Sequence, residues 1–338
     1  MRVLVTGGAG YVGSQTTRLL QSTGHEPIVL DTLDNGHREA IPGVELVVGS
    51  VADGPLVHRL LVDRGIEAVL HFAALKAAEE SVHEPGRYFS VNVGGSFALL
   101  AAMEAAAVPW FVFSSTCGVY GEPRAVPIAE GAETRPENPY GESKLLVERA
   151  LPWYESRGIQ SVSLRYFNAA GAQADGEHGE DWRHAPNLVP VAIKSALGHG
   201  GPLRIFGTDY PTPDGTAIRD YVHVADLADA HVRALGHLAG GAGSTTINLG
   251  TGTGSSVREV ISEVERATGR SIDVIEAPRR VGDPAAVWAD PAKAEEILGW
   301  RAQHGLTGIV ETAVRWHTGH PDGYPEAAAG PGKGAADG

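Results

Sequence analysis

Short runs of apolar residues alternate with longer amphipathic segments over the first half of the chain. Several runs are apolar throughout, which is typical of strands buried on both faces of a parallel sheet. The pattern predicts strands and helices in alternation, as in a doubly wound α/β fold with right-handed crossovers. The expected strands are Arg2–Thr6, Pro27–Asp31, Glu45–Val48, Ala68–Phe72, Trp110–Ser114 and Ser161–Tyr166. The expected helices are Val12–Gln21, Pro55–Arg64, Val91–Ala107 and Lys144–Ser156.

The pattern changes after Asn168. Residues 169–221 are rich in Gly, Pro, Asp and His and carry few long periodic segments, which indicates a loop-rich lobe placed over a site. Regular patterns return over Tyr221–Leu238 and Thr246–Leu249, where the chain is expected to rejoin the sheet. The spacing of apolar residues in Val257–Thr268 predicts an amphipathic helix.

Composition and charge narrow the class of protein. The chain has 338 residues, of which 43% are hydrophobic and 20% charged, as in a soluble globular protein with two lobes. A net charge of −14 makes it a poor candidate for nucleic-acid binding. Cys117 is the single cysteine, which favours a reducing compartment. We find neither a signal peptide nor an apolar run of membrane-spanning length, so we expect a cytoplasmic protein without a membrane partner.

A glycine-rich turn joins the first expected strand to the first expected helix. Gly7, Gly10 and Gly13 follow a G-x-x-G-x-x-G spacing, which permits a tight turn, close approach of a pyrophosphate to the backbone, and packing of the helix on the strand. The motif alone is also compatible with a turn that binds nothing. Asp31 ends the second expected strand, where an acid hydrogen-bonds ribose hydroxyls and disfavours a 2′-phosphate. We therefore expect NAD rather than NADP.

A second group of residues carries candidate chemistry. Thr116 follows Ser114 and Ser115 at the end of the fifth expected strand, and Tyr140 and Lys144 are spaced to share one helix face. A nearby ammonium and the positive nicotinamide of NAD+ are expected to lower the phenol pKa and make Tyr140 a base. Because ligands bind beyond the carboxyl ends of parallel strands, we interpret Thr116, Tyr140 and Lys144 as catalytic.

These motifs resemble those of the extended short-chain dehydrogenase/reductase family and, within it, the UDP-glucose 4-epimerases (UDP-galactose 4-epimerases). The resemblance runs from Met1 to about Tyr324. The similar stretches are Met1–Gly13, His71–Lys76, Ser114–Gly121, Pro139–Lys144, Arg165–Gly171, Ile205–Pro211, Ile218–Ala228, Asn248–Gly250, Arg280–Asp283 and Trp288–Asp290.

The resemblance implies reversible epimerisation at C4 of UDP-galactose and UDP-glucose, through a transient 4-keto sugar and with tightly bound NAD. It implies that Tyr140 takes the proton of the 4-hydroxyl, that Lys144 binds the nicotinamide ribose, and that Thr116 assists Tyr140. It also implies a homodimer, formed through helices around Val91–Ala107 and Lys144–Ser156. No metal is expected.

The resemblance further assigns two sets of binding residues. Those implied to bind NAD are Gly7, Gly10, Tyr11, Val12, Gly13, Asp31, Asn35, Ser50, Val51, Phe72, Ala73, Lys76, Asn92, Ser114, Tyr140, Lys144 and Phe167. Those implied to bind the UDP-sugar are Lys76, Thr116, Tyr140, Asn168, Asn187, Leu188, Phe206, Arg219, Arg280, Asp283 and Val287. The arginines suit a diphosphate, because guanidinium pairs bidentately with phosphate oxygens.

Three positions depart from the family pattern. Ser50 stands where an Asp is usual near the adenine, and Glu79 stands where a glycine is usual. Val287 stands where a large tyrosine restricts some members to UDP-glucose and UDP-galactose. From this smaller residue we hypothesise a side activity on UDP-GlcNAc and UDP-GalNAc.

The expected architecture is a Rossmann-type doubly wound parallel sheet with a smaller, mixed α/β substrate-binding domain. The expected boundaries are residues 1–168 with about 222–248 for the NAD-binding domain, residues 169–221 with 249–325 for the UDP-sugar-binding domain, and residues 326–338 for a disordered tail.

Three other functions stay open at this point. A sugar-nucleotide 4,6-dehydratase needs an acid pair after the threonine, where this chain has Cys117 and Gly118. A UDP-glucuronate-type epimerase or decarboxylase lacks a matching local pattern. A non-catalytic NAD-binding regulator usually lacks Tyr or Lys of the pair, whereas both are present here.

Overall fold

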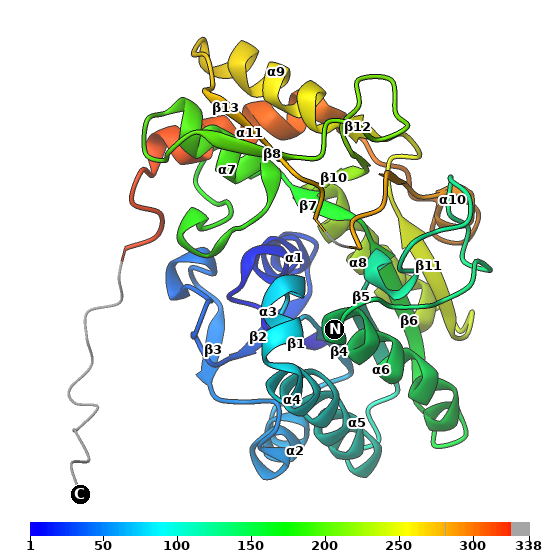
Figure 1. Ribbon diagram of the computed structural model, residues 1–338. Helices are drawn as coiled ribbons and strands as arrows, with labels where there is room; N and C mark the ends of the chain where they lie inside the picture. The colour runs from blue at the N-terminus through cyan, green and yellow to red at the C-terminus, as the bar shows by residue number, and fades with distance from the viewer. Residues whose placement is uncertain (281, 326–338) are drawn as a thin grey trace, which may run out of the picture.

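A computed structural model describes residues 1–280 and 282–325. Its centre is a seven-stranded sheet in the order β11-β6-β5-β4-β1-β2-β3, and all pairings within it are parallel (Figure 1). The strand order reverses between β1 and β4, which places a ligand-binding crevice at their carboxyl ends. The strands are β1 Arg2–Thr6, β2 Glu26–Asp31, β3 Glu45–Val48, β4 Ala68–His71, β5 Trp110–Thr116, β6 Gln160–Tyr166 and β11 Thr245–Leu249.

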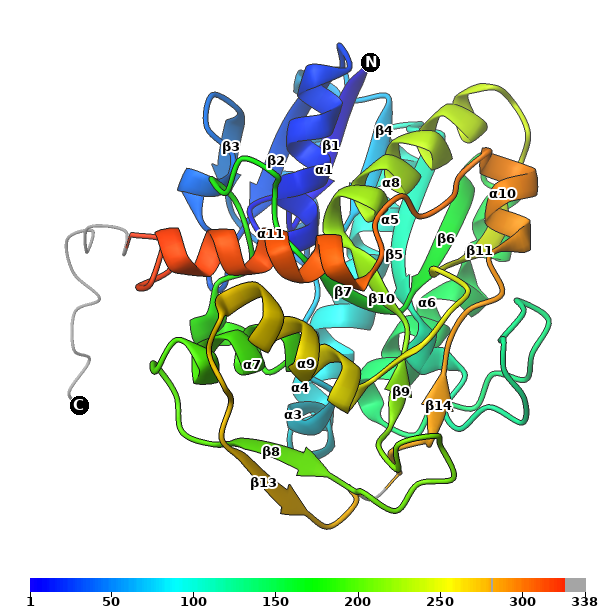
Figure 2. The ribbon, with the colours of Figure 1, turned by 90° about the horizontal axis from the view of Figure 1, so that it is seen from above.

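Successive side chains of the sheet enter two different apolar clusters. Val3 and Val5 of β1 pack with Leu227 on one face, whereas Leu4 packs with Leu99 on the other. Figure 2 shows α1 and α8 together on one face of the strands. This burial on both faces explains the uninterrupted apolar runs, and the six strands expected from them are confirmed. The main helices of this part are α1 Tyr11–Ser22, α2 Gly54–Asp63, α5 Gly95–Ala105, α6 Pro139–Glu155 and α8 Val224–Ala239.

The segment predicted as one helix over Val91–Ala107 does not begin as a regular α-helix. Phe89–Gly94 forms a π-helical turn, and α5 follows it. The side chain of Asn92 contacts the loop that follows β4, where its Oδ1 accepts from Leu75 N (2.8 Å) and its Nδ2 donates to Leu75 O (3.0 Å). Turns of this kind are widened and often occur at functional sites.

A second, smaller lobe lies beside the carboxyl ends of the strands (Figure 1). Three helices share one apolar cluster, and short strands flank them. The helices are α7 Leu188–Ala196, α9 Val257–Thr268 and α11 Leu306–Gly319. The strands are the pair β8 Leu203–Phe206 and β13 Val274–Ala277, and the trio β12 Ser255–Ser256, β9 Ile218–Arg219 and β14 Ala286–Val287. The other elements include α3 Ala78–His83, α4 Pro85–Tyr88, β7 Asn168–Ala170, β10 Tyr221–His223 and α10 Ala292–Leu298.

The prediction that residues 169–221 are loop-rich was wrong for Leu188–Ala196 and Leu203–Phe206. Helix α7 is short and mostly apolar and carries Pro190 in its first turn, so its nine residues give only a weak signal for a helix. Its Ile193 is buried against the other helices of the lobe. The amphipathic helix expected over Val257–Thr268 is confirmed.

None of the helices in the described part of the chain combines the length and apolar character needed to cross a bilayer. The tail expected over residues 326–338 lies outside the described residues. The exact domain boundaries stay a prediction.

Candidate active site

The glycine turn is shaped for close backbone packing. Gly7 has a φ of +70°, and a Cβ there would lie 2.5 Å from the backbone nitrogen of Ala73. A Cβ at Gly13 would lie 2.2 Å from Gly7 O. Gly10 caps α1 without a side chain, and the first turn of α1 has no acidic residue. The helix N-terminus therefore presents N–H groups and a positive dipole end, which fit a dinucleotide pyrophosphate.

Asp31 is held beside this turn. Its Oδ2 accepts from Ala9 N (3.0 Å) and its Oδ1 accepts from Leu33 N (2.9 Å). Burial raises the pKa of the Asp31 carboxyl, while these two hydrogen bonds oppose the rise. The carboxylate is thus fixed at the end of β2, in the position predicted for contact with the adenosine ribose.

The other predicted cofactor residues lie on the same edge of the sheet or on loops that leave it. Their roles in binding stay predictions. Tyr11 and Val12 begin α1, Asn35 follows β2, Ser50 and Val51 follow β3, Phe72, Ala73 and Lys76 follow β4, Asn92 lies in the π-helical turn, Ser114 lies near the end of β5, and Phe167 follows β6.

Two capping interactions bring Tyr140 and Thr116 together. The side chain of Asn138 accepts from Gly141 N (2.9 Å), so α6 begins directly before Tyr140. Thr116 ends β5 and accepts from Gly118 N (3.1 Å). The Thr116 hydroxyl lies near the phenol and opposes part of the rise in the Tyr140 pKa that burial causes.

A lowering of the phenol pKa by Lys144 is not seen in this structure, and the combined effect of Lys144 and NAD+ stays a prediction. Burial dominates and raises the pKa of Tyr140 well above its usual value. Lys144 Nζ instead donates to Ser114 O (2.9 Å) and lies 5.0 Å from the ring centroid of Phe113. Burial also lowers the pKa of Lys144 to about 7, and Glu148 opposes this change. The phenol is therefore neutral at pH 7 unless further positive charge is nearby.

Sequence reasoning missed Glu148. It lies four residues beyond Lys144 on α6 and forms a buried ion pair with Arg165 of β6, with Nη2 and Oε2 2.5 Å apart. Ser115 donates to the same carboxylate. Arg165 in a buried strand was the available signal, because a buried charge needs a partner. The acid places a negative charge one helical turn from Lys144 and favours its ammonium form.

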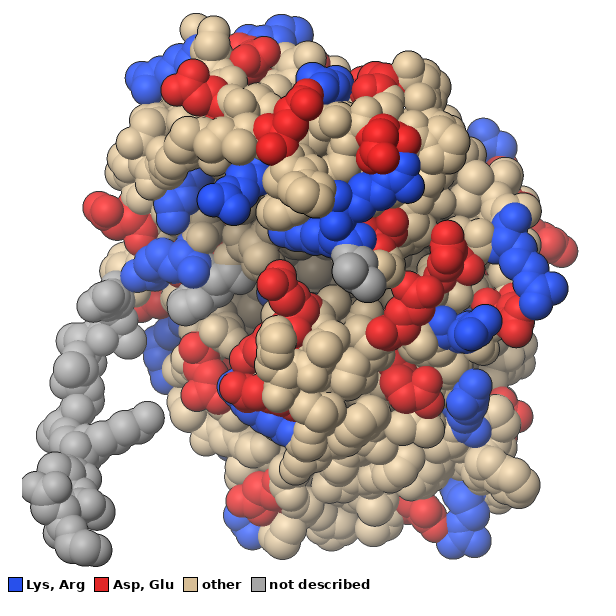
Figure 3. All heavy atoms as spheres, in the orientation of Figure 1, with Lys and Arg blue, Asp and Glu red and all other residues tan. Residues whose placement is uncertain are grey.

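The predicted sugar-nucleotide residues come mainly from the second lobe. Arg219 and Val287 are direct neighbours in the register of β9 and β14. Arg219 forms an ion pair with Asp283. The Arg280 guanidinium lies 4.0 Å from the ring centroid of Phe206. Figure 3 shows a band of Lys and Arg side chains along one side of a surface hollow, as a diphosphate would require.

Three further residues of this set lie at the starts of β7 and α7. Asn168 begins β7, and its N–H donates to Asp220 O (2.9 Å). Asn187 is the N-cap of α7 but makes no side-chain cap, and Leu188 is the first residue of that helix.

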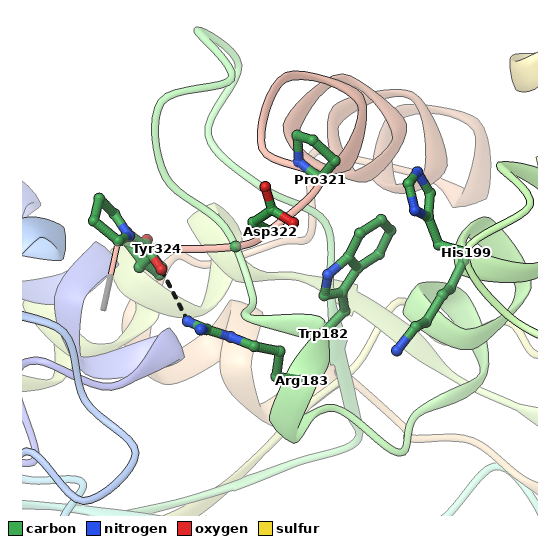
Figure 4. A pocket seen from close by; sticks show the side chains of 9 residues that line it. Trp182, Arg183, His199, Pro321, Asp322 and Tyr324 are labelled. Carbon is green, nitrogen blue, oxygen red and sulfur yellow. Dashed lines mark hydrogen bonds between the residues drawn. The ribbon is translucent and has the colours of Figure 1, made fainter. Parts of the chain in front are cut away.

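A cavity of about 620 Å³ lies elsewhere in the second lobe, between Trp182–His184, α7 and the segment after α11 (Figure 4). None of the predicted site residues lines it. Its walls include Trp182, Lys194 and His199. The candidate catalytic residues thus belong to a different place, at the carboxyl edge of the sheet.

The strand order and the turn at its switch point define the class: a Rossmann-type dinucleotide-binding protein with a Tyr-Lys helix at the ligand edge. Residues 3–250 match the profile of the NAD dependent epimerase/dehydratase family, and the chain belongs to this family.

Known relatives match nearly the whole chain. A UDP-glucose 4-epimerase of Lactobacillus helveticus is 45% identical over 331 residues, which cover 96% of this chain and 100% of the relative. A UDP-glucose 4-epimerase from Stenotrophomonas maltophila, solved with bound NAD and formylated UDP-arabinopyranose, has a TM-score of 0.92 and 42% identity, covering 95% of this chain and 99% of that one. One from Bifidobacterium longum, solved with NAD+ and UDP, has a TM-score of 0.90 and 39% identity, covering 96% and 100%.

The glycine turn generates a direct prediction. Gly13→Ala should reduce NAD bound by the purified protein at least about tenfold, because the new Cβ meets Gly7 O and displaces the turn. Bound NAD is measured by chromatography after denaturation. Gly236→Ala on α8 is the control, since a Cβ there meets no atom within 4 Å. Wild-type NAD content in Gly13→Ala would contradict the assigned role.

Proposed function

We propose that this protein catalyses the reversible epimerisation at C4 of UDP-galactose and UDP-glucose, through a transient 4-keto sugar and with tightly held NAD. The observation that carries the proposal is the packing of the start of α6, with Tyr140, against the end of β5, with Thr116, one helical turn from Lys144. Support comes from the full-length similarity to UDP-glucose 4-epimerases.

Different residues bind different parts of the cofactor. The glycine turn and α1 hold the pyrophosphate, and Asp31 holds the adenosine ribose. Lys144, already fixed against Ser114 O, holds the nicotinamide ribose. The chemistry that NAD supplies when bound is the acceptance and return of a hydride at the sugar C4.

Tyr140 accepts and returns the proton of the sugar 4-hydroxyl. It accepts the proton of the 4-hydroxyl as the C4 carbonyl forms, and returns it to the same oxygen when the carbonyl is reduced from the other face. Thr116 donates a hydrogen bond to this oxygen. Because burial keeps the phenol neutral, positive charge at Lys144 and at NAD+ is needed to make Tyr140 a base. Proton transfer by Tyr140 therefore requires bound NAD+.

The dehydratase alternative lacks its acid. Cys117 and Gly118 follow Thr116 in a short helical turn, and burial raises the pKa of the Cys117 thiol to about 12. A thiol with this pKa transfers protons poorly at neutral pH. A non-catalytic regulator would not need Thr116, Tyr140 and Lys144 together at this edge of the sheet.

An activity assay tests the proposal. Purified protein mixed with UDP-galactose, without added NAD, should form UDP-glucose. Tyr140→Phe should lower kcat by about 10²–10⁴-fold, the usual contribution of a general base, while bound NAD stays unchanged. Turnover near that of the wild type in this variant would sink the mechanism, and a 4-keto-6-deoxy product would identify a dehydratase.

We further propose a side activity on UDP-GlcNAc and UDP-GalNAc. Val287 is a small side chain, only 8% exposed, next to Arg219 in the sheet register. Val287→Tyr should lower activity on the N-acetylated sugars at least about tenfold, because the larger side chain leaves less room for the N-acetyl group. The effect on UDP-galactose should be much smaller. Coupled assays with both substrate pairs measure this ratio. No N-acetyl activity in the wild type would refute the idea.

We also propose a homodimer through the face that α5 and α6 present. Trp153 of α6 is 79% exposed, and Val91 and Phe97, in the π-helical turn and α5, are also exposed. Exposed apolar groups of this kind mark interaction surfaces.

Light scattering tests the homodimer. The wild type should have the mass of two chains, and Trp153→Glu should shift it toward one, because a charge is then buried in the interface. Ile275→Glu, on β13 in the second lobe, is a matched control that should leave the mass unchanged. A wild-type mass of one chain would exclude the dimer.

A further inference from the structure

Residues 171–181 of the second lobe run across the carboxyl edge of the sheet. We name this part of the chain the latch segment. It contacts Tyr11 after β1, His37 after β2 and Lys76 after β4. These three strands are consecutive in the sheet, in the order β4-β1-β2. Because a dinucleotide lies along this edge, the segment spans the crevice that would hold it.

One set of contacts joins the latch segment to α1. Tyr11 Oη donates to Gly171 O (2.5 Å), and Gln15 Nε2 donates to His178 O (3.4 Å). Arg18 Nη1 lies 2.5 Å from His178 Nε2. The three α1 residues are spaced to share one face of the helix whose N-terminus forms the pyrophosphate site.

A second set consists of an ion pair and a contact between a histidine and a carboxylate. Lys76 Nζ lies 2.9 Å from Glu180 Oε1, and the Glu180 side chain is only 6% exposed. His37 Nε2 lies 3.1 Å from Asp181 Oδ2. A buried carboxylate that loses its partner is costly, so these contacts resist opening. The Lys76 ammonium also gives Glu180 a cationic partner, which limits the repulsion between this acid and a bound diphosphate.

The opposite side of the latch segment is fixed to the second lobe. Trp316 Nε1 donates to Glu180 O (2.9 Å). Gly179 packs closely on the Trp316 ring, since a Cβ at Gly179 would lie 2.5 Å from it. The Gly179 N–H donates to Tyr324 Oη (3.3 Å). Just beyond the segment, Arg183 donates to Tyr324 O (2.9 Å; Figure 4). The segment is thus anchored on one side and held to the nucleotide edge by polar contacts on the other.

We propose that the latch segment retains NAD, with Glu180 and Tyr11 as the residues that keep it in place. The proposal rests on the proposed function, because it requires NAD at this edge. Two residues that the latch segment holds, Tyr11 and Lys76, are themselves predicted cofactor residues. Release of the dinucleotide then requires the latch contacts to break. Retention suits a reaction that regenerates its cofactor in place.

The test compares rates of cofactor exchange. Protein loaded with NAD is mixed with excess isotopically labelled NAD, and bound label is followed by mass spectrometry. Glu180→Gln keeps the shape of the side chain but removes its charge, and should speed exchange at least about tenfold, as expected for loss of one charge-assisted hydrogen bond. Tyr11→Phe removes only the hydroxyl and should also speed exchange, by a smaller factor.

Glu177→Gln is the matched control. It makes the same charge change within the latch segment, and the Glu177 side chain forms no hydrogen bond among the described residues. Its exchange should match that of the wild type. Wild-type exchange in both Glu180→Gln and Tyr11→Phe would overturn the latch, as would equal acceleration in the control. Failure of the wild type to bind NAD would instead reject the proposed function. If Glu180→Gln does not fold, Tyr11→Phe decides.

Discussion

The start of α6 lies against the turn that follows β5, and this contact sets the geometry of the candidate active site. A Cβ at Gly141 would lie 2.6 Å from Gly118 O, so only glycine allows the two backbones to come this close. The caps made by Asn138 and Thr116 fix the ends of the two elements. As a result Tyr140 faces the threonine hydroxyl. The helix then carries Lys144 to the sheet edge, where the glycine turn provides a place for NAD.

The electrostatics of the site follow from burial. Desolvation raises the pKa of Tyr140 and lowers that of Lys144 to about 7, so both groups are pushed toward their neutral forms. Glu148 opposes this for Lys144, and its own charge is balanced by Arg165. In the proposed mechanism, Tyr140 is therefore inactive as a base until positive charge is added. This couples proton transfer to the presence of NAD+ and of a charged Lys144.

Much of this arrangement could be predicted from the sequence. The strands were recognisable because both faces are buried, and the glycine turn and the Tyr-Lys spacing are local patterns. Helix α7 was missed because it is short and mostly apolar and carries Pro190 in its first turn. The pair of Glu148 and Arg165 needs knowledge of how α6 packs on β6. The contact between Tyr11 and Gly171 joins residues 160 positions apart, and no local pattern reports it.

The pKa of Tyr140 could not be predicted from the sequence for a different reason. Spacing correctly placed Lys144 on the same helix, but it could not show that the ammonium turns to Ser114 O or that burial outweighs it. Such a balance depends on the environment of the whole side chain rather than on its neighbours in sequence.

The central claim is that hydrogen leaves and returns at C4 without mixing with water, while the hydroxyl proton passes through Tyr140. UDP-galactose that carries deuterium at C4 tests it most directly, with the UDP-glucose formed in ordinary water analysed by NMR. The account predicts that the deuterium stays at C4 of the product. Loss of the deuterium to solvent during turnover would contradict it.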